Sequence, residues 1–151
     1  ILSNKSNYQN LTDLFMYLAS RNENFHYIIS KNYKKRVIII DRFIDSTIAY
    51  QHYGMGINKR LIINLNKLIL KNIKPNFTFI NTVSMKNLKS RINKRPKNRY
   101  DKFDHKFYNK VQKGFIKIAK NRKNYMIINS DHKISENKKK ILNKIKSLLK
   151  I

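Results

Sequence analysis

VIIIDRFIDSTIAYQHYGMG, residues Val37 to Gly56, opens with a β-branched run that stops at Asp41-Arg42-Phe43. Such a run predicts a buried strand over residues 36–41, whose last side chains project from its carboxyl edge. Ligands of open parallel α/β sheets bind at that edge, so the carboxylate of Asp41 and the guanidinium of Arg42 are candidate site residues. An ordinary strand that ends in solvated charges fits the local pattern equally well.

Helical and extended patterns alternate over the rest of the chain. Helices are expected at residues 10–31, 46–53, 58–71, 84–93, 104–120 and from 135 to near the C-terminal end, and two further strands at 77–81 and 125–129. This alternation predicts an α/β fold with parallel strands joined by right-handed crossovers. No repeat or flexible linker divides the sequence, so we expect one domain over residues 1–151.

Several details of these helices follow from residue type. Asn10 or Thr12, Ser84 and Ser135 are the expected helix caps, because their side chains can accept from free backbone N–H groups. The expected buried positions of the 58–71 helix and of the last helix are Leu61, Ile62, Leu65, Leu68, Ile69, Ile141, Ile145, Leu148 and Leu149.

Composition limits the class of protein. The 151 residues include no cysteine, which excludes a disulfide framework and a cysteine-bearing metal site. No apolar run approaches the ~20 residues that span a membrane, and the N-terminus does not resemble a signal peptide. We therefore expect a soluble, cytoplasmic protein with no membrane partner.

The net charge of +26, from 34 Lys and Arg against 8 Asp and Glu, normally indicates a polyanionic partner. Here the three commonest residues are Lys, Asn and Ile, which A/T-rich codons encode, and the charge is spread along the chain. We therefore expect no dedicated nucleic-acid partner, although a basic module that binds nucleic acid stays open as an alternative function.

Residues 41–56 closely resemble the signature of bacterial thymidylate kinase, DRF-x-DST-x-AYQG-x-GRG. Further matches follow in the family's order: LFMYLASR at 14–21, KPNFTFIN at 74–81 and RYDKFDHKFYNKVQKGF at 99–115. The resemblance implies a P-loop nucleoside monophosphate kinase fold. It also implies transfer of the γ-phosphoryl group of ATP, with Mg²⁺, to dTMP, giving dTDP. A kinase with a different nucleoside monophosphate acceptor stays open as an alternative.

The resemblance also assigns roles to single residues. Arg42 matches the arginine that grips the acceptor phosphate, and Asp41 the acid that acts near magnesium and its waters. Tyr17 stands where the family usually has a Phe that stacks on thymine, and Tyr retains that aromatic face. The other residues matched to the dTMP site are Arg21 at a thymine carbonyl, Thr47 at the base edge, Tyr50 at the deoxyribose and Gln51 behind Tyr50.

The basic stretch from Arg91 to Lys102 has no apolar periodicity and predicts a mobile loop. By resemblance, a lid at about 94–103 closes over ATP, with Arg91, Arg95 and Arg99 as candidate arginines and Arg95 and Arg99 as the catalytic ones. Arg99 is the best placed, because Arg99-Tyr100-Asp101 aligns with the lid's DRFE. The family's preceding Asp is Asn98 in this chain.

The family's phosphate loop, G-x-x-x-x-G-K-[ST], has no counterpart in these residues. The three glycines are Gly54, Gly56 and Gly114, and none lies in that pattern. The resemblance therefore implies an N-terminally truncated kinase that holds the acceptor site and lid, in which ordinary ATP turnover is not expected. Of the family's sheet order 2-3-1-4-5, about three strands remain, so residues 37–41 either pair with 77–81 or leave a gap. We expect marginal stability, and a homodimer at full length.

Overall fold

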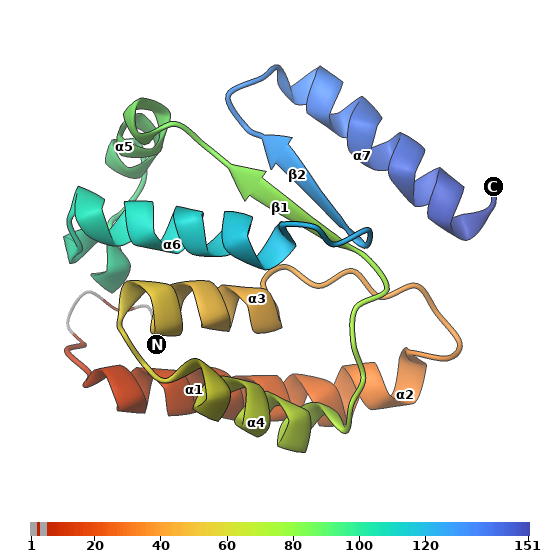
Figure 1. Ribbon diagram of the computed structural model, residues 1–151, viewed down its shortest axis with the longest axis horizontal. Helices are drawn as coiled ribbons and strands as arrows, with labels where there is room; N and C mark the ends of the chain where they lie inside the picture. The colour runs from red at the N-terminus through yellow and green to blue at the C-terminus, as the bar shows by residue number, and fades with distance from the viewer. Residues whose placement is uncertain (1–2, 4–5) are drawn as a thin grey trace. The chain divides into compact units, whose positions relative to one another are not determined.

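The computed structural model describes residue 3 and residues 6–151 (Figure 1). The chain forms two compact units, which are described separately. The first contains the residues up to Lys74 together with Lys97–Ile118, and the second contains Pro75–Pro96 and Ala119–Ile151.

The first unit begins with a nearly continuous helical segment. It comprises α1 (Asn10–Asn24), the π-helical η1 (Phe25–Ile29) and α2 (Ser30–Asn32), which confirms the helix expected at 10–31. The N-cap is Gln9, without a side-chain hydrogen bond, so the predicted cap at Asn10 or Thr12 is wrong. The Asn10 amide instead donates to the carbonyl of Met55, at 3.3 Å.

The signature stretch forms α3 (Ile44–Thr47) and the π-helical η2 (Ile48–Gly54), and α4 (Lys59–Leu70) follows. Asn58 caps α4 by accepting from the N–H groups of Arg60 and Leu61. Leu61 and Leu68 were expected to be buried, but both are exposed, Leu68 by 76%. The buried line of α4 instead runs through Ile62, Asn66 and Leu70, four residues apart, because that face packs on α1.

The strand expected at 36–41 is wrong. In the described part of the chain the sheet contains β1 and β2 only, and residues 37–40 belong to no helix or strand. Ile38 packs on the core cluster of Phe25, Ile29 and Leu70, whereas Val37 and Ile39 are exposed, Ile39 by 85%. A strand needs a neighbour to pair its backbone groups, and a β-branched run does not show whether that neighbour is present.

Two further elements complete the first unit. The 3₁₀ turn η3 (Arg99–Lys102) has a capping box between Asn98 and Asp101. Helix α6 (His105–Ala119) confirms the helix expected at 104–120 and buries Phe107, Val111 and Ile118. The irregular loop expected at 91–102 is therefore wrong at both ends, because Arg91–Asn93 are the last residues of a helix and Arg99–Lys102 form the η3 turn.

The second unit contains a two-stranded parallel sheet and two helices (Figure 1). Strand β1 (Thr78–Thr82) pairs with β2 (Tyr125–Asn129) in a register from Thr78↔Tyr125 to Thr82↔Asn129. Ser84 caps α5 (Met85–Asn93) by accepting from the N–H of Asn87, as expected. The α/β class and both of these strands are confirmed, but the sheet has two strands instead of about three.

The last helix, α7 (Ile134–Leu149), starts one residue before its expected cap. Its N-cap is Lys133, without a side-chain hydrogen bond, so the predicted cap at Ser135 is wrong. Leu148 and Leu149 are exposed, while Ile141 and Ile145 are half-buried. Two five-residue strands offer too small a face to cover a sixteen-residue helix. Within the described residues, no helix is long and apolar enough to cross a membrane.

Gly114 of α6 allows a close approach between α6 and η2. A Cβ atom built at Gly114 would lie 2.5 Å from Cδ2 of Tyr53. We expect Gly114→Ala to lower the free energy of unfolding by about 1–2 kcal/mol, because overpacking outweighs the gain in helix propensity. Urea unfolding measures this, with Lys113→Ala on the exposed side as the control. A Gly114→Ala variant as stable as the parent would contradict this close contact.

Candidate functional site

Arg42 has an unusual backbone conformation. Its φ of 64° lies in the left-handed region, where non-glycine residues are uncommon and persist only when their surroundings hold them there. Its guanidinium carbon lies 5.1 Å from the centre of the Tyr50 ring. Burial by itself lowers the pKa of Arg42. The nearby Tyr50, Asp41 and Tyr17 together raise this pKa by more than burial lowers it, so the net shift is upward. The chain thus holds a charged, planar fork over an aromatic face, an arrangement suited to an anion.

Arg21 connects three segments of the first unit. From α1 it donates to Oδ1 of Asn66 at 2.7 Å, to the carbonyl of Phe43 at 3.1 Å and to Oγ1 of Thr47 at 2.8 Å. Asn66 is itself fixed by donating to the carbonyl of Ile62. Burial lowers the pKa of Arg21 to about 10, so it remains charged at neutral pH. These acceptors are neutral, and they use only part of the five donors of a guanidinium.

Three tyrosines from separate segments lie close together. The Tyr50 ring of η2 meets the Tyr100 ring of η3 edge to face, with centroids 5.4 Å apart. The Tyr17 ring of α1 lies 6.4 Å from that of Tyr100. We call Tyr17, Tyr50 and Tyr100 the tyrosine cluster. Tyr50 also contacts Phe107 and Phe115 of α6, which fixes one side of the cluster against the core.

A buried carboxylate lies behind the tyrosine cluster. Asp13 of α1 is 1% exposed and forms an ion pair with Arg99, which is 7% exposed. Its Oδ2 atom accepts from the hydroxyl of Tyr100 at 2.6 Å and from Nε2 of Gln51 at 3.0 Å. Burial, followed by a hydrogen bond with Tyr17, raises the pKa of Tyr100 above its usual value. We call Asp13, Gln51, Arg99 and Tyr100 the Asp13 cluster.

The structure groups most of the site residues expected from the sequence. The first unit holds Tyr17, Arg21, Asp41, Arg42, Thr47, Tyr50, Gln51 and Arg99. Thr47 and Gln51 are buried, and each receives or makes a hydrogen bond described above. Arg91 and Arg95 belong to the second unit. There Arg91 donates to the carbonyl of Ser130 at 2.7 Å and Arg95 to that of Pro96 at 3.0 Å.

Two residues of this region were not selected from the sequence. Asp13 is an acid in the first turn of a helix, a common position that does not by itself indicate a site, and Tyr100 enters the sequence analysis only as part of the lid alignment. The available signal was that Tyr100 follows Arg99 inside a matched motif. The partnership with Asp13, 87 residues away, has no local signature.

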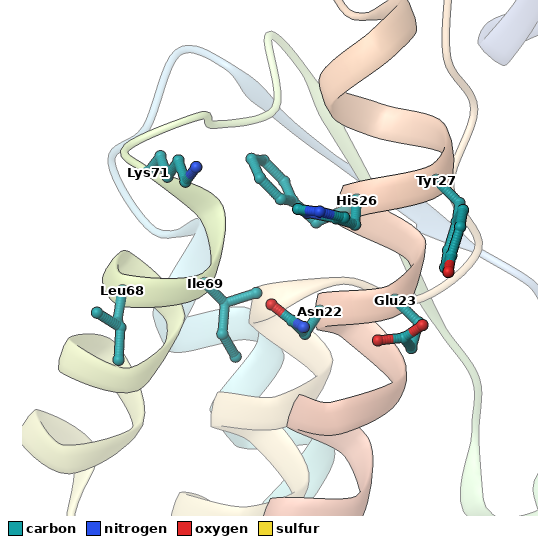
Figure 2. Close-up of a pocket in the computed structure, with 8 residues that line it drawn as sticks. Asn22, Glu23, His26, Tyr27, Leu68, Ile69 and Lys71 are labelled. Carbon is teal, nitrogen blue, oxygen red and sulfur yellow. The ribbon is translucent and has the colours of Figure 1, made fainter.

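A pocket of about 320 Å³ lies elsewhere in the first unit, between the end of α1, η1 and the end of α4. Figure 2 shows His26 on one side of it and Ile69 and Lys71 on the other, with Glu23 and Tyr27 turned away from α4. None of the expected site residues lines this pocket. The region around Arg42 and the tyrosine cluster is therefore the stronger candidate site, because charged donors and aromatic faces converge there.

Comparisons with known proteins agree on one family. A family model described as thymidylate kinase matches residues 1–141. The chain is 39% identical over 119 residues to a thymidylate kinase from Anaplasma phagocytophilum, covering 78% of this chain and 52% of that protein. It is 44% identical over 111 residues to one from Ehrlichia chaffeensis, covering 73% and 53%.

A structural comparison indicates the same family. The crystal structure of thymidylate kinase from Ehrlichia chaffeensis aligns with a TM-score of 0.72 at 30% identity, over 93% of this chain and 70% of that chain. The present chain covers 52% of the length of the Anaplasma relative and 64% of the length of a thymidylate kinase from Ehrlichia ruminantium.

The Arg21 hydrogen bonds lead to a prediction of stability. In Arg21→Lys the ammonium group has no planar fork, so at least one of the oxygens of Asn66, Phe43 and Thr47 loses its donor. We expect the free energy of unfolding to fall by about 1–3 kcal/mol. Chemical denaturation measures it, with Arg60→Lys on the exposed side of α4 as the matched control. Equal stabilities of the two variants would show that the Arg21 contacts do not hold these segments together.

Proposed function

Because the chain belongs to the thymidylate kinase family, we propose that its first unit is the dTMP site of a kinase that makes dTDP from dTMP and ATP. Phosphoryl transfer needs little covalent chemistry from the protein, and catalysis comes mainly from positioning the two nucleotides and neutralising their charge. The observation that carries the proposal is the charged guanidinium of Arg42, held in a left-handed conformation over Tyr50.

Arg42 is proposed to grip the phosphate of dTMP. A guanidinium can bind two phosphate oxygens at once, which fixes both the position and the rotation of the group. The ring of Tyr50 supports the guanidinium from behind. With its phosphate fixed, dTMP presents an oxygen in line with the γ-phosphoryl group of ATP.

The thymine base is proposed to stack on Tyr17, with its polar edge toward Arg21 and Thr47. Arg21 retains donors beyond its contacts to Asn66, Phe43 and Thr47, which suits a thymine carbonyl. The Thr47 hydroxyl accepts from Arg21, so its own hydrogen is available to a base oxygen. Tyr50 is proposed to pack against the deoxyribose, with Gln51 holding the wall behind it through Asp13.

The donor side is proposed from the same family. Within the described residues no three His, Asp or Glu side chains gather to hold a metal. Mg²⁺ in kinases keeps several waters and is bound by phosphates with one or two carboxylates. Asp41 fits that indirect role beside Arg42. When bound, Mg²⁺ neutralises charge on the transferred phosphate.

Residues 94–103 are proposed to be the lid, within a single thymidylate-kinase-like domain over residues 1–151. Arg91, Arg95 and Arg99 are its proposed arginines, with Arg95 and Arg99 as the catalytic ones. Arg91 and Arg95 are exposed, whereas Arg99 is ion-paired with Asp13. Contact between Arg99 and ATP therefore requires that ion pair to open. A homodimer and a cytoplasmic location are proposed from the family alone.

The test measures binding, because these 151 residues contain no phosphate loop to hold ATP. In calorimetric titration we expect the chain to bind dTMP, and Arg42→Ala to weaken that binding by about 10- to 100-fold, the value of a charge-assisted contact. Thymidine, which lacks the phosphate, should bind the parent and Arg42→Ala equally.

Arg60→Ala, which removes an exposed arginine from α4, is the control for net charge. An equal loss of dTMP affinity in Arg42→Ala and Arg60→Ala would mean that only general electrostatics attracts the nucleotide. Equal or tighter binding of dCMP or dGMP would show that the acceptor is a nucleoside monophosphate other than dTMP. Binding of DNA that is tighter than binding of dTMP, depends on salt and is unchanged in Arg42→Ala would support a nucleic-acid module instead.

A further inference from the structure

We infer that Asp13 is a positioning residue of this site: its buried carboxylate holds Arg99 and Tyr100 against α1 and η2, so that the Tyr100 ring forms a wall of the nucleoside pocket. The identity of the ligand in that pocket rests on the proposed function. The docking of the Arg99–Tyr100 turn does not, because it is a property of the chain without ligand.

Burial makes Asp13 depend on its partners. A carboxylate that is 1% exposed has lost its hydration and is tolerated only when it is paired and hydrogen-bonded. Oδ1 pairs with Arg99, while Oδ2 accepts from Tyr100 and Gln51. Oδ2 is thus hydrogen-bonded, and Oδ1 ion-paired, by side chains 38 to 87 residues away, so the burial of Asp13 is linked to the docking of η2 and η3.

The turn that Asp13 holds is rigid in itself. The Asn98 side chain accepts from the N–H of Tyr100 at 2.9 Å, and Asp101 accepts from the N–H of Asn98 at 2.8 Å. The Tyr108 hydroxyl donates to the carbonyl of Tyr100 at 3.0 Å. These hydrogen bonds tie the turn together, so an anchor on Arg99 and Tyr100 orients all of it.

Arg99 is held by two aromatic rings as well as by its charge. Its guanidinium carbon lies 5.2 Å from the Tyr8 ring centre and 4.7 Å from that of Tyr100. Cation–π contacts of this kind favour keeping the guanidinium beside the two rings. Asp13 supplies the opposite charge.

The consequence for the site comes through Tyr100. Its hydroxyl is held by Asp13, so its ring stays at 5.4 Å from Tyr50 and 6.4 Å from Tyr17, the two residues proposed to contact the sugar and the base. Asp13 itself lies behind these rings and touches no proposed ligand atom. Losing its charge would remove the ion pair with the buried Arg99, and the turn would leave its place beside the tyrosine cluster.

The test compares Asp13→Asn, which keeps the size of the side chain and removes its charge, with Glu23→Gln, an exposed neutralisation on the same helix. Limited trypsin digestion of the ligand-free chain reports the turn through cleavage after Arg99 and Lys102. Cleavage in the Lys138–Lys140 run of α7 is the internal reference. We expect Asp13→Asn to raise cleavage at the turn by about tenfold relative to α7, as loss of a charged contact predicts. Glu23→Gln should leave the ratio unchanged.

Affinity supplies the second readout. We expect Asp13→Asn to weaken dTMP and thymidine binding by the same factor, about tenfold, because the pocket wall is affected and the phosphate contact of Arg42 is not. Tyr100→Phe, which keeps the ring and the Asp13–Arg99 pair, should give a smaller change in the same direction. It also serves as the folded variant if Asp13→Asn does not fold.

The digestion and affinity results together test whether Asp13 anchors the Arg99–Tyr100 turn. Faster cleavage at all sites alike, or no change at the turn, would overturn the role of Asp13, as would full affinity in a variant whose turn is exposed. If the parent chain binds no dTMP while Asp13→Asn selectively exposes Arg99 and Lys102, the proposed function fails and the anchoring role of Asp13 stands.

Discussion

The need to neutralise one buried carboxylate organises the first unit. Asp13 lies on the inner face of α1 and is 1% exposed; Arg99 is its ion-pair partner, and Tyr100 and Gln51 donate hydrogen bonds to its Oδ2 atom. Those partners come from η2 and η3, so the same contacts bring Tyr50 and Tyr100 together beside Tyr17. Arg21 performs the equivalent task on the neighbouring turns of α1 by tying α4 to Phe43 and Thr47, at the two ends of α3.

Local pattern was enough to predict the helices and the two paired strands. The periodic apolar positions of α1, α4 and α6 and the short runs at 78–82 and 125–129 are properties of neighbouring residues, and the structure confirms the helices and strands that they predict. The strand expected at 36–41 was wrong because strand formation depends on a partner elsewhere in the chain. The exposure of Leu61, Leu68, Leu148 and Leu149 has a similar cause, since the apolar side of a helix is buried only where another element covers it.

The site was predicted to the extent that its residues lie in one motif. Arg42, Thr47, Tyr50 and Gln51 come from one continuous stretch, and Tyr17 and Arg21 share a face of α1 one turn apart. Asp13 and Tyr100 were not predicted, because their roles depend on the hydrogen bond between them, which joins residues 87 positions apart in the sequence. Arg99 was noticed, but as a lid residue that reaches outward, and only the folded chain shows it paired with Asp13.

Arg42, Tyr17 and Arg21 are proposed to form one nucleotide site, and a crystal structure of this chain with dTMP would test this. We expect the phosphate on the guanidinium of Arg42 and the thymine ring on Tyr17, with a carbonyl oxygen at Arg21. A nucleotide bound elsewhere, such as the pocket between His26 and Lys71, with Arg42 out of contact with the phosphate, would contradict it.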